Sequence, residues 1–80
     1  MPKVFDWQGY RFHFYANEGN PREAIHIHVR KGRDDAKFWL GPQVVLADNR
    51  GFSPKVLNAL ASVIEDHRDE IERAWNVFFS

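Results

Sequence analysis

Regular alternation of apolar and other side chains in two segments constrains the fold of this chain more than any other feature. Residues 10–16 carry aromatic side chains at every second position, and residues 25–31 do the same with β-branched ones. A period of two puts successive side chains on opposite faces, so each segment predicts a strand with one apolar face. Residues 17–24, rich in Asn, Gly and Pro, predict a hairpin connection longer than a tight turn.

Two more strands and a helix are predicted after this hairpin. The strands are expected over residues 36–40 and 44–47, because turn-forming residues follow each of them. Ser53-Pro54 has the form of an N-cap and a first helical residue, and apolar side chains at helical spacing then predict a helix over residues 54–78. The fold class is therefore α+β, with a small antiparallel sheet of three to four strands packed on one face by a C-terminal helix.

The length of this helix leaves two arrangements open. An unbroken helix would be about 39 Å long, whereas strands of this size span about 17–20 Å. Either the helix breaks near His67, where Arg68 interrupts the apolar stripe and predicts a bend or a snorkelling side chain, or its end docks on a partner or a second copy. In the second arrangement the candidate interface consists of Trp75, Phe78 and Phe79.

Composition restricts the class of protein. Eighty residues predict one domain, residues 1–80, whose core must supply the stability, because the chain has no cysteine for disulfides or thiolate zinc sites. No apolar run is long enough for a membrane span and none resembles a signal peptide, so we expect a cytoplasmic protein without membrane contact. The net charge is zero, but residues 1–55 carry nine basic and six acidic side chains, and residues 56–80 carry two and five. This asymmetry is too small to indicate nucleic-acid binding by itself.

The sheet face away from the helix is the candidate binding site. We expect Ile25, Ile27 and Val29 to pack with Phe12 and Phe14 against Leu57, Leu60 and Ile64. The second half of each alternation then lies outside this core, including both His26 and His28. The candidate face comprises His13, Tyr15, His26, His28, Arg30, Lys37 and Trp39.

This face is compatible with several kinds of chemistry. Its three histidines could hold a zinc ion with Glu18 or Glu23. Tyr15 and Trp39 could stack RNA bases while Arg30, Lys31, Arg33 and Lys37 hold phosphates. His26 and His28 could also act as general acid and base in RNA cleavage. The alternative is a set of half-exposed strand residues, and we assign no metal and no cofactor. Because the familiar enzyme motifs are absent, a non-enzyme is favoured.

The strings FYANEGNPREAIHIHVRKG, AKFWL, NRGFSP and AWNVFF resemble the small prokaryotic domain-of-unknown-function family 4160. The resemblance covers nearly the whole chain. Its hallmark is a His-x-His-Val motif, here residues 26–29, followed by a basic residue and glycine. Many members have two prolines where this chain has Ala24-Ile25, and an Asp-His pair where it has Glu18-Gly19.

The resemblance implies a small partner protein encoded nearby, as in the toxin–antitoxin-like pairs suggested for the family. We therefore favour a protein-interaction or regulatory module, in particular a toxin–antitoxin-type component that binds such a partner or forms a homodimer. An RNA-binding protein or small ribonuclease using the His26/His28 face is the alternative, and a metal-binding domain is third.

Overall fold

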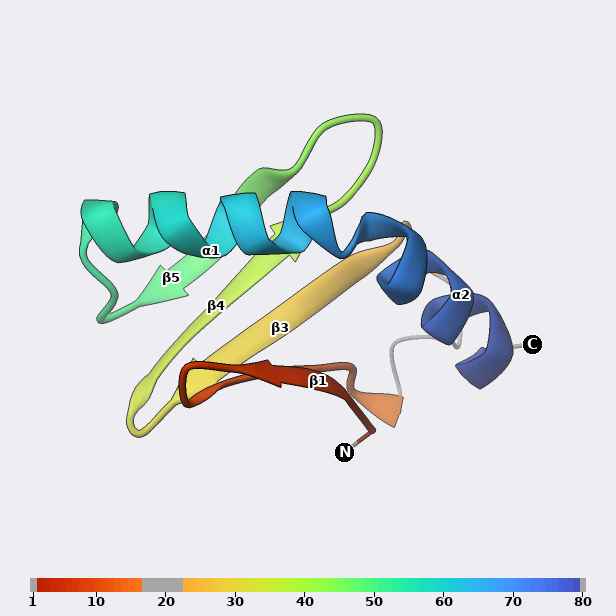
Figure 1. Ribbon diagram of the computed structural model, residues 1–80, viewed down its shortest axis with the longest axis horizontal. Coiled ribbons are helices and arrows are strands. Elements are labelled where there is room, and N and C mark those ends of the chain that lie inside the picture. The colour runs from red at the N-terminus through yellow and green to blue at the C-terminus, as the bar shows by residue number, and fades with distance from the viewer. Residues whose placement is uncertain (1, 17–22, 80) are drawn as a thin grey trace.

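A computed structural model describes residues 2–16 and 23–79, which form one antiparallel sheet and two helices (Figure 1). The sheet has five strands, and each strand pairs with its neighbour in the chain, so the spatial order is also the sequence order. The fold is α+β, as predicted. The strands are β1 (Lys3–Trp7), β2 (Tyr10–His13), β3 (His26–Lys31), β4 (Asp34–Trp39) and β5 (Val45–Arg50), and the helices are α1 (Pro54–Asp66) and α2 (Arg68–Phe78).

The predicted number of three to four strands is too low. The apolar segment at residues 4–7 is part of β1, which pairs with β2 through a turn in which Gln8 and Gly9 both have positive φ, 48° and 84°. Two such residues are typical of a type I′ turn, whose twist matches that of the strands it joins. Because this turn needs only two residues, the short segment before it can form an edge strand.

The last strand is longer than predicted. Residues 48–50 were expected to form a turn, but they continue β5 because Asp48 pairs with Lys37 and Arg50 pairs with Asp35 on β4. An irregular register between Lys37 and Phe38 leaves Ala47 as an extra residue on β5, which is the pattern of a β-bulge. Tertiary pairing thus outweighs the local turn tendency of these polar residues. β2, by contrast, is shorter than predicted, because it ends at His13 and not at residue 16.

The core lies mainly between one face of the sheet and α1, and Ile71 and Trp75 of α2 extend it. The predicted alternation is present in the middle of the central strands, where Phe12, Ile27, Val29, Ala36 and Phe38 are buried on the side of α1. Ser53 caps α1, with its hydroxyl accepting a hydrogen bond from the Val56 N–H at 3.2 Å. The residues buried between sheet and α1 include Phe12, Ile27, Val29, Ala36, Phe38, Leu60, Val63 and Ile64.

The helical segment changes direction at His67, which is one of the two arrangements left open by the sequence. The His67 ring stacks on Phe5 of β1 at 4.1 Å between centroids, and Arg68 donates a hydrogen bond to the Leu40 carbonyl at 2.7 Å. Arg68 also pairs with Glu65 at 2.8 Å. These contacts attach the bend to the sheet, so α2 turns across the end where β3 begins (Figure 1).

Among the described residues, neither helix is long and apolar enough to cross a membrane. The predicted hairpin connection at residues 17–24 lies mostly outside the described residues, which resume at Glu23.

Candidate functional site

The sheet face opposite α1 carries polar side chains, and we call it the polar face. Its members follow from the strand register, because residues directly opposite each other on neighbouring strands point to the same side. One row crosses the sheet near the hairpin turns, a second crosses its middle, and a third lies where β3 begins. The rows are Asp6, Arg11, Arg30, Asp35 and Arg50; Lys3, His13, His28, Lys37 and Asp48; and His26, Trp39 and Val45.

Two histidines of the middle row meet a third predicted residue, Tyr15, which follows β2. The rings of His13 and His28 are stacked with centroids 5.6 Å apart, and Tyr15 lies edge-on to both, at 5.0 Å from His13 and 4.4 Å from His28. His13 is only 1% exposed, whereas His28 and Tyr15 are partly exposed. A ligand on this face would therefore meet Tyr15 and His28, with His13 behind them.

Burial favours the neutral form of His13. Loss of solvation lowers its pKa, and the neighbouring His28, Arg11 and Arg30 lower it further by charge repulsion, against a hydrogen bond with Phe14 that raises it. Its Nδ1 has no hydrogen-bond partner within the described residues. The enclosed His13 ring packs against Tyr15 and His28 and is not open to a substrate.

His26 is placed differently from the prediction. It is 0% exposed, its Nδ1 donates to the Ala24 carbonyl at 2.9 Å, and its ring lies 5.3 Å from Trp39 and 5.1 Å from Trp75 of α2. The expectation that both His26 and His28 lie outside the helix-covered region is thus wrong for His26. The cause is the bend at His67, which brings Trp75 over the end of the sheet. A surface acid–base pair of His26 and His28 does not fit this arrangement.

Lys37 and Trp39 contact each other across the polar face. The Lys37 ammonium lies 4.3 Å from the centre of the Trp39 ring and 3.6 Å from a carboxylate oxygen of Glu23. The first is a cation–π contact and the second an ion pair, and Lys37 makes both from a half-exposed position. Glu23 therefore partly compensates the charge of Lys37, and the Lys37 ammonium covers one face of the Trp39 indole.

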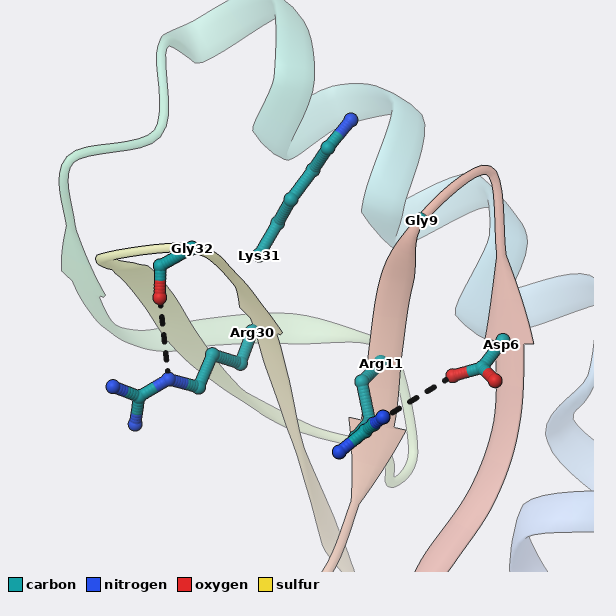
Figure 2. A pocket seen from close by; sticks show the side chains of 6 residues that line it. All are labelled: Asp6, Gly9, Arg11, Arg30, Lys31 and Gly32. Carbon is teal, nitrogen blue, oxygen red and sulfur yellow. Dashed lines mark hydrogen bonds and ion pairs between the residues drawn. The ribbon is translucent and has the colours of Figure 1, made fainter.

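Arg30 stands at the far end of this face, beside a residue that sequence reasoning missed. Arg11 is directly opposite it on β2, and the two lie in a surface depression of about 510 Å³ with the turns at Gly9 and Gly32 (Figure 2). The signal was present, because Arg11 falls on the same side of the 10–16 alternation as His13. The other lining residues are Asp6 and Lys31.

The predicted partner interface is only partly at the surface. Trp75 is 1% exposed and contacts Phe14, so it belongs to the core of the domain itself. Phe79 is partly buried against Trp75 at 4.3 Å, whereas Phe78 is 41% exposed beside the more exposed Val77. The length mismatch behind the prediction disappears with the bend, and Phe78 is the member that remains open to solvent.

A candidate metal centre is not formed by the described residues, in which no group of three His, Cys, Asp or Glu side chains is arranged to hold an ion. Glu18, one of the two carboxylates considered as a ligand, lies outside them. Glu23, the other, faces Lys37.

A second surface, the β5 groove, was not predicted. Val45 and Leu46 on the edge strand are 52% and 42% exposed, although strand residues of this type are usually buried. Leu46 opens into a groove of about 300 Å³ between β5 and α1. The groove is lined by Phe38, Val44, Leu46, Pro54, Leu57, Asn58 and Ala61.

Comparison with known proteins gives one match. The family described as "Domain of unknown function (DUF4160)" matches residues 9–76, which is most of the chain. The chain belongs to this family. No curated protein and no solved structure matches it significantly.

The DUF4160 match includes most of both surfaces. The His-x-His-Val motif, Arg11 and Arg30 lie inside it, and so does every residue that lines the β5 groove. Asp6 and Phe78 lie outside it. Both surfaces are therefore built mainly from the part of the chain that defines the family.

Proposed function

We propose that this DUF4160 domain is a protein-interaction module that binds an extended, apolar segment of a partner protein along β5 and in the β5 groove. One observation carries the proposal: an edge strand with exposed Val45 and Leu46 lies directly beside an apolar groove under α1. Strand addition at an edge combines main-chain hydrogen bonds with pockets for alternate side chains.

The groove favours an apolar occupant. Six of its seven lining residues are apolar, and the seventh, Asn58, is an uncharged amide. No charged side chain within the described residues lines it, so a charged partner group would lose solvation there without gaining an ion pair. An aliphatic or aromatic side chain would instead cover Leu46 and Leu57.

The edge strand favours a short partner segment. The outer edge of β5 has no neighbouring strand among the described residues. The bulge at Ala47 interrupts the regular edge, as edges that avoid indiscriminate pairing commonly do. A partner would therefore pair with only a few residues and would depend on the groove for specificity.

In its regulatory form, the proposal makes the domain one component of a toxin–antitoxin-type pair, with the partner a small protein encoded beside it, acting in a bacterial cytoplasm. The family resemblance and the two surfaces on so small a domain support this form. The β5 groove is the surface on which that partner, rather than a second copy of the domain, is expected to dock.

Selection from random peptides displayed on phage tests the proposal without a known partner. The immobilised domain should enrich peptides with apolar side chains at alternate positions. Asn58→Trp fills the groove from α1 and should weaken their binding at least about tenfold, since a docked apolar side chain contributes about 1.5–3 kcal/mol. Ala59→Trp adds the same side chain at the next, exposed position outside the groove, and should have little effect.

Two results would contradict the proposal. Peptides that bind both tryptophan variants equally well do not use the groove. A wild-type dimer in sedimentation, separated into folded monomers by Leu46→Lys, would mean that a second copy occupies β5.

A further inference from the structure

We propose that Arg11 and Arg30 form a binding site for a phosphate group at the open end of the polar face. This site lies on the opposite side of the sheet from the β5 groove, so it goes beyond the proposed function and does not depend on it.

Two like charges face each other at this site. Arg11 and Arg30 are directly opposite each other on β2 and β3, and like charges at such positions repel. The carboxylates beside them compensate weakly. Asp6 is 3.9 Å from Arg11, and Asp35, although opposite Arg30, forms no ion pair with it in the described structure. An anion between the two arginines would remove the repulsion.

The directions of the two side chains leave a space between them. Arg30 donates from Nε to the Gly32 carbonyl at 3.3 Å, and the Arg11 Nε lies 3.9 Å from Asp6, so the two guanidinium groups stand apart on one side of the sheet (Figure 2). The bond to Gly32 holds Arg30 by Nε and leaves its two terminal amino groups without a partner in the described residues. The two guanidinium groups therefore lie on either side of an open space.

Lys31 does not belong to this site, although it lines the depression. Its side chain points to the other side of the sheet (Figure 2), where the ammonium lies 3.4 Å from the Gln8 carbonyl and 4.5 Å from the centre of the Tyr10 ring. The site is thus made of two guanidinium groups and not of a general basic surface.

The chemistry of guanidinium favours phosphate. Each planar fork can donate two parallel N–H groups to an oxyanion, and a phosphate has enough acceptor oxygens for both forks once the two exposed side chains turn toward it. The turn at Gly32 leaves room for it, because even an added Cβ there would meet no atom within 4 Å. The phosphate could be free or part of a nucleic-acid backbone, and the chemistry of recognition is the same.

Amide chemical shifts measured at constant ionic strength test this site with two probes, orthophosphate and a uridine pentanucleotide. We expect saturable shifts at the Gly9 and Gly32 amides. Arg11→Gln and Arg30→Gln should each weaken binding at least about tenfold, because each removes a charge-assisted contact. Arg50→Gln removes the same charge from the same row, on the far side of Asp35, and should retain binding. Since these arginines are exposed, unchanged amide dispersion verifies that the variants fold.

A gain-of-affinity variant sharpens the test. Asp6→Asn removes the carboxylate that competes for Arg11 and should tighten orthophosphate binding several-fold. Asp48→Asn, which removes the same charge at the β5 edge of the polar face, should change it less.

The two probes separate the sources. Comparable affinity for both indicates free phosphate, and tighter binding of the oligonucleotide indicates a nucleic-acid backbone. Shifts that are absent, that persist equally in all three arginine variants, or that acetate reproduces at the same concentration would overturn the proposal.

Discussion

The two ends of the polar face have the same sequence pattern but opposite environments. At one end His26 is completely buried beneath Trp75, and at the other Arg30 is exposed on the same strand and the same face. The register that places them together is set by the alternation, whereas the difference between them is set by α2, which covers only one end (Figure 1). The strand pattern thus determines to which side of the sheet a side chain points, and the path of the helix determines whether that side chain is exposed to solvent.

Removal of Trp75, the side chain that covers His26, should have the largest effect on stability. Trp75→Ala should destabilise the domain by about 3–5 kcal/mol, as truncation of a buried tryptophan does, and should expose His26. Phe78→Ala, three residues further along α2 and 41% exposed, should cost much less. Urea unfolding of both variants measures the comparison. Similar losses for the two would show that the end of α2 packs otherwise than described.

The core face should respond nearly as strongly. Ile27 is 0% exposed, and Ile27→Ala should cost about 2–5 kcal/mol. Ile25→Ala deletes the same atoms from a half-buried position and should cost less than half as much. A loss below about 1 kcal/mol for Ile27→Ala, in the range of surface substitutions, would contradict the assignment of the two faces.

The bend that directs α2 is the next target. Arg68→Ala removes the hydrogen bond to the Leu40 carbonyl and should cost about 1–3 kcal/mol, because that acceptor loses its partner in a part-buried position. Arg73→Ala, at an exposed position of α2, should be close to neutral. A neutral Arg68→Ala in the same urea titrations would mean that His67 and Phe5 hold the bend without it.

These contrasts also show what could be predicted from the sequence. The alternation predicted the two faces, and the Ser53-Pro54 pair predicted the start of the helix, because both depend on local geometry. The burial of His26 could not be predicted, because it depends on the bend. The bend in turn depends on a contact between Arg68 and Leu40, which are 28 positions apart in the sequence. The β5 groove escaped prediction for the same reason, because its walls come from β4, β5 and α1.

The pair of Arg11 and Arg30 is intermediate between these cases. Each residue could be assigned to the polar face from the alternation, yet only the register of β2 with β3 places them directly opposite each other. Register depends on the connecting segment as well as on the pattern, so the like-charge pair was visible only in the structure.

The smallest expected effect is a dependence of stability on pH that comes from His13. Its pKa in the folded protein is lowered, first by burial and then by the charges of His28, Arg11 and Arg30, whereas in the unfolded chain it is near 6.5. Between these two values the unfolded chain binds more protons, so the free energy of unfolding rises with pH. The stabilising contribution is complete above the unfolded pKa and is lost as the pH falls through the window below it.

Replacement of His13 isolates this contribution. Urea unfolding of the wild type between about pH 7.5 and about pH 5.5 should show a stability that falls as the solution becomes more acidic. His13→Phe keeps an aromatic ring against Tyr15 and His28 but cannot bind the proton, so its stability should fall less over the same range. His67→Phe, which removes an imidazole from the bend on the core side of the sheet, controls for the loss of any histidine. If the dependence of the unfolding free energy on pH is the same in His13→Phe as in the wild type, His13 is solvated in solution. The solvent-exposed end of the polar face then extends to the middle row.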